Sequence, residues 1–367
     1  MNIKKRSSLM RLIAFFLVAI ILVCTYGFTT DGWNISDSSV DKEMSAGQNS
    51  PSSGNGNTVE LPSQPVVTLP KYISFLTGLE TTEELYTKRP EAFIISTDSP
   101  LYGTSYSEIL VEIPIENGRT RLMAILTDTS DLWKAGSICP TRAYISNIAK
   151  FFGSAIVSLA KDESVQYNSC DTSKDEVDLS LNKDYYYSEY TYYTYTNANL
   201  LQNAISSSGI DVKLQENTNL PFIHNDPSKE EIESNIKAEN ISIIYSSASI
   251  SELIFSAETG KYGLHKNSVA CTDLLTNQKH EYKNCFVLFA DSVTYEDIIG
   301  EQTVMNTIGE GRGLYFTNGS CTEINWKSDA DGNLKFLNVD GSSLIVNRGK
   351  SYIAYVKSSR TDSVIFE

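Results

Sequence analysis

The stretch ILVEIPIENGRTRLMAIL, residues 109–126, decides the fold that we expect for the first half of the chain. Ile109 to Ile115 and Arg121 to Leu126 are apolar runs of strand length, rich in β-branched residues. Glu116-Asn117-Gly118 lies between them, and Asn-Gly readily adopts the positive φ angles of a tight turn. We therefore predict a β-hairpin.

The sequence around this hairpin mixes strands with helices. Residues 92–95 and 155–160 are short apolar runs typical of buried strands. Residues 142–152 place most of their apolar side chains on one helical face, and a short helix is expected over 199–206, ending before Gly209. Strands and helices do not alternate strictly, so we predict an α+β domain over residues 71–230, with α/β as the close alternative.

The sequence after a polar connection at 227–240 is typical of β structure. Strand-like runs begin at Ile241 and continue to Val356, separated by turn signals such as Asp331-Gly332-Asn333 and Asn347-Arg348-Gly349. We predict a mainly antiparallel β domain over residues 236–360, built as a β-sandwich or an open barrel.

The first 28 residues resemble an export signal. Lys4, Lys5, Arg6 and Arg11 precede or flank the apolar run from Leu12 to Cys24, a pattern that directs the following chain out of the cytoplasm. Cys24 stands where a bacterial lipoprotein would be cleaved and acylated, although Val23 is a poor fit to the small residue expected there. An uncleaved anchor is the alternative, at the short end of the length that spans a bilayer. Either way, we predict tethering at the extracytoplasmic face of a membrane.

Residues 29–70 form the predicted spacer. Ser, Gly, Asn and Pro make up 20 of these 42 residues, too polar a composition to bury a core.

The chain after the first segment is strongly acidic. The whole chain carries a formal charge of −15, and without the four basic residues of the first segment it has 26 bases against 45 acids, or −19. This balance excludes a nucleic-acid partner, because phosphate backbones attract clustered Lys and Arg.

Several motifs resemble the YerB-like lipoproteins of Gram-positive bacteria. The motifs are 311–319 (GRGLYFTNG), 323–327 (EINWK) and 347–350 (NRGK) in the second half, and 76–79 (LTGL), 116–121 (ENGRTR) and Arg142 in the first. The resemblance implies two extracytoplasmic domains of unknown activity. It also implies that this chain departs from its relatives where it has Cys139, Ser158, the segment 191–193 and Cys271 in place of an arginine and three histidines.

Four charged residues form the candidate ligand site. Even spacing would put Glu112 and Glu116 on one face of a regular strand, with Arg121 across the hairpin and Arg142 on the predicted helix. A buried ion pair that fixes strand register is one interpretation. The other is a pocket in which the two arginines hold a carboxylate or phosphate, since guanidinium groups suit such anions.

A tyrosine-rich segment is the most unusual local feature. It offers candidate interaction residues that combine apolar area with a polar tip, namely Tyr185, Tyr187, Tyr190, Tyr192, Tyr193 and Tyr195. The structural alternative is a segment whose alternate rings cover the edge of a core.

The sequence assigns no catalytic residue, metal site or cofactor. The chain has three histidines, and they show no metal-ligand or catalytic spacing. Five cysteines follow Cys24, of which Cys271 and Cys285 flank a predicted hairpin and are candidates for a disulfide, with free thiols as the alternative.

The combined prediction is a membrane-tethered binding or scaffolding protein of the bacterial cell envelope. Its expected partners are the membrane, through the first segment, and an envelope protein or cell-wall component. The alternatives are a cell-wall hydrolase or transferase that uses Glu112 or Glu116 as acid or base, and binding of a small anion by the arginines.

Overall fold

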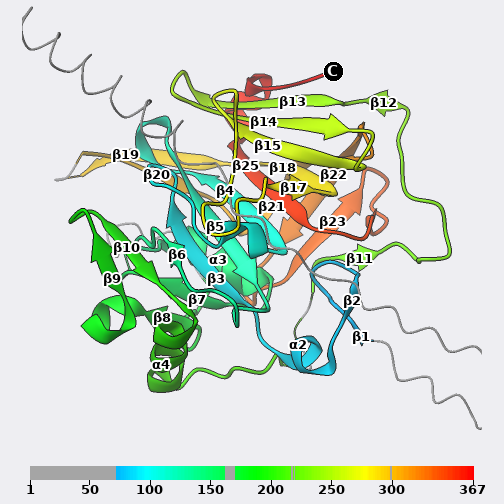
Figure 1. Ribbon diagram of the computed structural model, residues 1–367. Coiled ribbons are helices and arrows are strands. Elements are labelled where there is room, and N and C mark those ends of the chain that lie inside the picture. The colour runs from blue at the N-terminus through cyan, green and yellow to red at the C-terminus, as the bar shows by residue number, and fades with distance from the viewer. Residues whose placement is uncertain (1–71, 162–169, 216–217, 219, 298–299) are drawn as a thin grey trace, which may run out of the picture. The chain divides into compact units, whose positions relative to one another are not determined.

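The computed structural model describes residues 72–367 except 162–169, 216–217, 219 and 298–299 (Figure 1). The predicted export segment, Cys24 and the predicted spacer all lie outside these residues. The described residues all belong to one compact unit. Among the described residues, no helix combines the length and the apolar character needed to cross a bilayer.

A large mixed sheet runs through both halves of the chain. Its strands are, in order, β12 (Ile236–Lys237), β22 (Ser320–Ser328), β21 (Gly309–Thr317), β18 (Asn284–Ala290), β25 (Ser351–Lys357), β4 (Ile109–Pro114), β5 (Thr120–Leu126), β3 (Glu91–Ser96), β7 (Ala155–Ser158) and β8 (Glu176–Asp178), with β23 (Leu334–Asn338) beside β22. The halves join where β25 pairs in parallel with β4, at the centre of Figure 1.

Two smaller sheets accompany the large one. The second sheet contains β16 (Val269–Ala270), β15 (Lys261–Lys266), β14 (Ser249–Ser256), β13 (Asn240–Ser246) and β26 (Val364–Phe366), with β17 (Glu281–Tyr282) beside β15. The third contains β6 (Ala135–Gly136), β10 (Tyr193–Thr196) and β9 (Tyr187–Glu189). The remaining strand pairs are β1 (Tyr72–Ile73) with β2 (Glu80–Thr81), β11 (Ile223–His224) with β24 (Ile345–Val346), and β19 (Ser292–Asp297) with β20 (Gly300–Met305).

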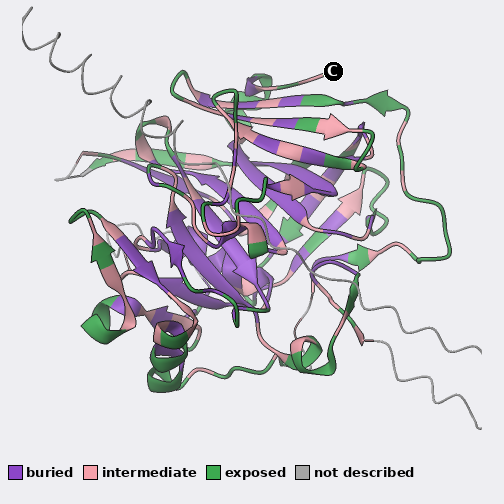
Figure 2. Cartoon of the chain, viewed as in Figure 1, coloured by how far each residue is buried: buried purple, intermediate pink, exposed green. Residues whose placement is uncertain are grey.

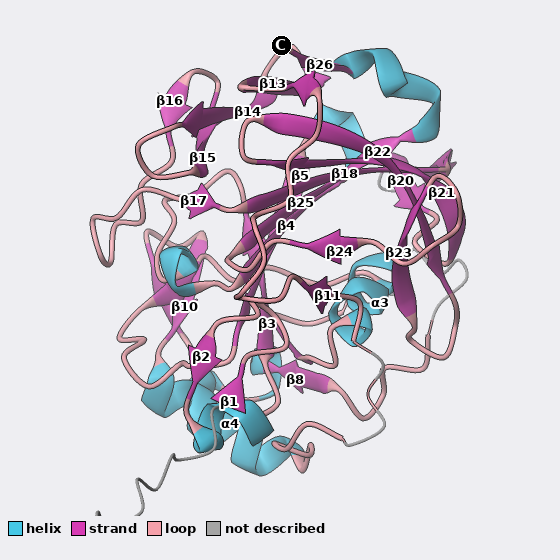
Figure 3. Cartoon of the chain, turned by 90° about the vertical axis from the view of Figure 1, so that its right-hand side faces the viewer, coloured by secondary structure: helices cyan, strands magenta, loops and turns pink. Residues whose placement is uncertain are grey.

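The helices are short and lie around the sheets (Figure 3). They are α2 (Glu83–Thr87), α3 (Ala143–Phe151) and α4 (Ala198–Ser208), and the 3-10 turns are η1 (Thr104–Tyr106), η2 (Glu116–Gly118), η3 (Leu179–Leu181), η4 (Lys183–Tyr185) and η5 (Ser358–Ser363). Helix α4 begins where the Asn197 side chain accepts a hydrogen bond from the Leu200 amide and ends at Gly209, whose φ is 70°. The molecule is thus mostly β with few helices.

The predicted hairpin is confirmed. Strands β4 and β5 pair antiparallel, and Asn117 and Gly118 have φ angles of 59° and 65°, as the turn requires. The expected C-terminal sandwich differs from the structure in one respect. The C-terminal strands form two packed sheets, but one of those sheets also contains the N-terminal strands, because β25 uses its free edge to pair with β4.

Both faces of the large sheet are covered at its centre, so the central strands β18, β25, β4, β5, β3 and β7 are buried nearly throughout (Figure 2). One face packs against α3. The other face packs against the second sheet and α4. Strand β4 therefore has buried residues on both sides: Val111 and Ile113 belong to the first core and Leu110 to the second. This arrangement determines where the candidate charged residues point.

Candidate functional site

Glu112 lies in the core between the large sheet and the second sheet, with no exposed surface. Its carboxylate forms an ion pair with Lys266 at the end of β15. It also accepts hydrogen bonds from Thr120 Oγ1 at 2.6 Å, Ser251 Oγ at 2.7 Å and the hydroxyl of Tyr352. Four strands from both halves of the chain thus supply the partners of one carboxylate.

This environment keeps Glu112 ionised. Burial alone would raise the pKa of its carboxyl group, but the ammonium group of Lys266 and the hydroxyls of Thr120 and Tyr352 outweigh burial and lower the pKa below its usual value. A general acid at neutral pH needs a raised pKa. The Glu112 cluster has instead the chemistry of a buried ion pair that fixes the two sheets against each other.

Glu116 and the two arginines lie on the opposite face of the sheet, near the start of α3. Arg142 Nη1 is 2.5 Å from Glu116 Oε2 and 3.4 Å from the hydroxyl of Tyr144. Arg121 Nη1 donates to the carbonyl of Pro140 at 2.7 Å. Burial opposes ionisation of Glu116, but the hydrogen bond from Arg142 prevails and lowers its pKa.

The expectation that Glu112 and Glu116 share one face is therefore wrong. It assumed that the strand stays regular up to the turn, but β4 ends at Pro114 and η2 follows at Glu116. The structure brings together Glu116, Arg121 and Arg142 and places Glu112 on the other side of the sheet, against Lys266. Sequence reasoning missed Lys266 and Tyr352, because neither stands near Glu112 in the sequence and no motif marks them.

The tyrosine segment forms the β9–β10 hairpin, at the left of Figures 1 and 2. At its base, Tyr195 is buried, and the ammonium group of Lys134 lies 4.0 Å from its ring centroid and 3.9 Å from that of Tyr102. Lys134 also donates to both carboxylate oxygens of Glu189 at 2.9 Å. The hairpin is thus held to the body of the protein by an aromatic and ionic contact.

The tip of this hairpin is exposed. Tyr190 and Tyr192 have relative exposures of 82% and 86%. Tyr190 and Thr191 have φ angles of 52° and 68°, which turn the chain between the two strands. Tyr185, Tyr187 and Tyr193 are half-buried along the strands and the preceding turn. The segment therefore both covers a core edge, through Tyr195, and presents free rings at its tip.

The cysteines after Cys24 are free thiols, so the predicted Cys271–Cys285 disulfide is not formed. Cys285 lies in β18 at the centre of the large sheet, whereas Cys271 follows β16 at the edge of the second sheet, so the two belong to different sheets. Burial raises the pKa of Cys139 and Cys271 to about 11. Neither is an activated nucleophile at neutral pH.

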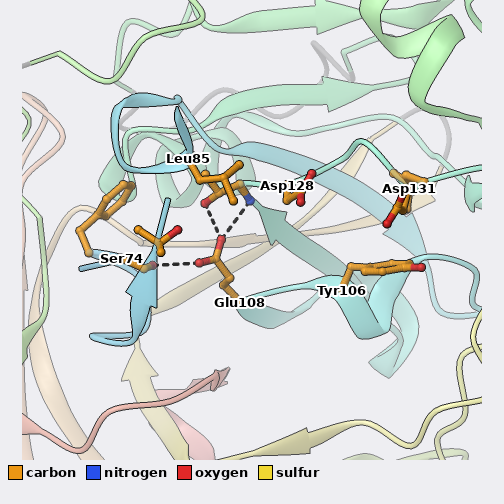
Figure 4. Close-up of a pocket in the computed structure, with 10 residues that line it drawn as sticks. Ser74, Leu85, Tyr106, Glu108, Asp128 and Asp131 are labelled. Carbon is orange, nitrogen blue, oxygen red and sulfur yellow. Dashed lines mark hydrogen bonds between the residues drawn. The ribbon is translucent and has the colours of Figure 1, made fainter. Parts of the chain in front are cut away.

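A small cavity of about 130 Å³ lies beside Glu108, a residue that the sequence did not single out (Figure 4). Glu108 accepts hydrogen bonds from Ser74 Oγ at 2.9 Å, from the Thr127 amide at 3.0 Å and from the Thr127 hydroxyl. Both of its oxygens are thus occupied. Glu108, just before β4, thus links the segment after β1, through Ser74, to the end of β5, through Thr127. Glu108 directly precedes a predicted strand, and no sequence signal distinguishes it from an ordinary flanking residue.

Comparisons with known proteins agree with this architecture. Residues 76–211 match the N-terminal domain, and residues 240–353 the C-terminal domain, of a protein family of unknown function, DUF3048. These matches cover more than half of the chain, which therefore belongs to the DUF3048 family. The YerB protein from Bacillus subtilis, a solved structure, has a TM-score of 0.67 and 21% identity and covers 81% of this chain and 100% of its own. No curated protein matches the chain.

The predicted membership in a YerB-like, two-domain family is thus confirmed. At 21% identity the structural likeness supports the fold alone, and the family carries no assigned activity. In the described part of the chain, no three side chains of His, Cys, Asp or Glu converge as ligands for a metal ion. The features that remain as candidates for a function are the charged clusters, the tyrosine hairpin and the cavities.

Proposed function

We propose that this chain is a membrane-tethered, extracytoplasmic protein of the bacterial cell envelope that binds another envelope protein through the β9–β10 hairpin and catalyses no reaction. The tether is proposed from the sequence: a basic and apolar first segment followed by a polar spacer. Mass spectrometry of the mature N-terminus distinguishes a lipid on Cys24 from an uncleaved anchor.

The observation that carries the binding proposal is the exposure of Tyr190 and Tyr192 on an anchored hairpin. Both rings are in contact with water, and burying them against a partner would stabilise the complex, since apolar burial contributes about 25 cal/mol per Å². Tyrosine loses few rotamers on binding and is enriched among the residues that dominate interface energies. The fixed base, held by Lys134 and Tyr195, reduces the entropy that the hairpin loses when it binds.

A protein partner fits this tip better than a wall polymer. Rings on a two-stranded turn suit a concave pocket on another protein, where an aromatic anchor is fully desolvated. The sequence after residue 28 carries a formal charge of −19, which opposes association with anionic wall polymers. The experiment must therefore distinguish a protein partner from a wall polymer.

The other candidate functions have less support. A hydrolase or transferase would need a carboxyl group with a raised pKa in a cleft, but Glu112 is fully buried and the pKa values of Glu112 and Glu116 are both lowered. Anion binding by Arg121 and Arg142 would compete with the carboxylate of Glu116, which already lies against Arg142, while Arg121 already donates to the carbonyl of Pro140.

The test is capture by the full-length chain in detergent-solubilised bacterial membranes. We expect one or more envelope proteins to be retained by the wild type, lost with the Tyr190→Ala/Tyr192→Ala double variant and kept with Tyr86→Ala, a half-exposed tyrosine on α2. Parallel sedimentation with purified wall fragments tests the polymer. Equal capture by the double variant, or hairpin-dependent binding to wall fragments alone, would overturn the proposal.

A further inference from the structure

A second cavity, independent of the β9–β10 hairpin, lies where the two halves of the chain meet. It is lined by residues of β15 and β17, two strands that are labelled in Figure 3. Its volume is about 240 Å³. The N-terminal half contributes Ser105 and Ser107, and the C-terminal half contributes Lys261, Lys279 and Lys350. Three lysines thus converge on one cavity in a protein that is otherwise strongly acidic.

Among the described residues, no carboxylate lies within ion-pair distance of the lysines of this cavity. None of Lys261, Lys279 and Lys350 forms an ion pair with a described residue, whereas Lys266 in β15 and Lys283 between β17 and β18 do. Glu281 is the single carboxylate among the residues that line the cavity. The cavity therefore carries a net positive charge with room for a counter-ion.

Lys350 is the half-buried centre of this charge. Its ammonium group donates to the carbonyl of Ser105 at 2.6 Å, which uses one of its three N–H donors. Burial and then repulsion from Lys261 lower its pKa, although Glu108 and Asp273 act in the opposite direction. Removing a charge from water without a partner is costly, and an anion in the cavity would offset that cost.

Glu108 and Asp273, the two acids that act on Lys350, do not fill this role because their oxygens are already used. Both oxygens of Glu108 accept hydrogen bonds from Ser74 and Thr127. Asp273 accepts from the backbone amides of Gly103 at 3.1 Å, Ser105 at 2.6 Å and Leu275 at 2.7 Å. These bonds shape η1 and hold Ser105 at the edge of the cavity.

The remaining polar groups favour an oxyanion. Ser105 Oγ lies 2.8 Å from Thr276 Oγ1, and when Thr276 donates in this pair the proton of the Ser105 hydroxyl is free for a ligand. His280 is not one of the cations: its ring nitrogens contact Thr104 Oγ1 at 2.7 Å and the Cys271 carbonyl at 3.2 Å, and burial lowers its pKa. Lysines and a hydroxyl remain available to a ligand.

We propose that this cavity binds a phosphate group. Lysine ammonium groups are effective point charges for phosphate, and three of them match the double negative charge of a phosphomonoester better than the single charge of a carboxylate. The phosphate belongs either to a soluble phosphomonoester or to a lipid headgroup that ends in a phosphomonoester, as in phosphatidic acid, because both present the same doubly charged group to the lysines. This proposal does not depend on the partner proposed for the hairpin.

The test is to titrate the purified full-length chain, in detergent, with inorganic phosphate at a constant ionic strength set with chloride. Binding is measured by the shift of the thermal midpoint and by calorimetry. We expect saturable binding that weakens about tenfold or more in Lys350→Met, because a hydrogen bond to a charged group contributes about 1.5–3 kcal/mol. Lys261→Ala, on an exposed side chain that cannot affect folding strongly, should weaken binding severalfold. Lys327→Ala, which pairs with Glu310 elsewhere, should not.

Two further arms identify the source of the phosphate. For the wild type and for each variant, the binding of glycerol 3-phosphate in solution is compared with the binding of vesicles that contain phosphatidic acid. Tighter binding of the ester than of vesicles assigns the site to a soluble phosphate, and the reverse assigns it to a headgroup. Absence of saturable phosphate binding, or identical affinities for wild type, Lys350→Met and Lys261→Ala, would overturn the proposal.

Discussion

Lys266 places its ammonium group against the fully buried carboxylate of Glu112, and the two residues stand 154 positions apart, in the C-terminal and N-terminal family domains. The contact crosses from the second sheet to the large sheet. This contact and the parallel pairing of β4 with β25 explain how the two family domains form one compact unit. Ser251 and Tyr352, from two further strands, complete the hydrogen bonds of the carboxylate.

The first prediction concerns this pair. Lys266→Met should destabilise the fold by about 3–5 kcal/mol, because it leaves an uncompensated carboxylate in the core. The matched control is the exposed pair Lys327–Glu310, with side chains 65% and 75% exposed, whose loss should cost less than about 1 kcal/mol. Urea denaturation measures both. Equal losses for the two pairs would contradict the role assigned to Glu112.

Glu91 supplies a pH-dependent prediction. Burial raises its pKa from 4.5 to about 7, and its Oε2 atom is buried without a hydrogen-bond partner. A folded pKa above the unfolded value means that its contribution to stability is complete below pH 4.5 and is lost as the pH rises through 7. The free energy of unfolding of Glu91→Gln, relative to that of the wild type, should therefore rise by about 3 kcal/mol as the pH goes from 4 to 8. A pH-independent difference in the free energy of unfolding would argue against this assignment.

The two ends of the tyrosine hairpin should respond differently to mutation. Tyr195→Ala should cost about 3–5 kcal/mol, because it removes a buried ring that packs on Lys134 and Tyr102. Tyr192→Ala should change stability by less than about 0.5 kcal/mol, because the ring is exposed. Thermal unfolding of the two variants checks this contrast. A large loss for Tyr192→Ala would assign the tip to the core instead of to a partner.

The free cysteines give a redox prediction. Dithiothreitol should leave the thermal midpoint unchanged, since the described cysteines form no disulfide. The buried thiols of Cys285 and Cys321 should react with a thiol reagent only after unfolding, because burial both hides them and raises their pKa. A lower midpoint in reductant would reveal a disulfide and contradict the structure.

Local features were predictable from the sequence, and long-range ones were not. The β4–β5 hairpin depends on Asn117-Gly118, and the end of α4 depends on Gly209; both are set by neighbouring residues. The β4–β25 pairing and the Glu112–Lys266 contact join segments far apart in the chain, where no spacing rule applies. The opposite orientations of Glu112 and Glu116 arise from the break in β4 after Pro114, which even spacing does not show. The lysine cavity likewise gathers residues from separate segments.

The most direct test of the proposed function is site-specific photo-crosslinking in bacterial membranes. A photoreactive amino acid replaces Tyr192 in the full-length chain, and a matched variant carries it at Val339, an exposed apolar residue after β23. We predict a discrete protein adduct from position 192 that is absent from position 339. No protein adduct from position 192, or the same adducts from both positions, would contradict the claim that this hairpin binds an envelope protein.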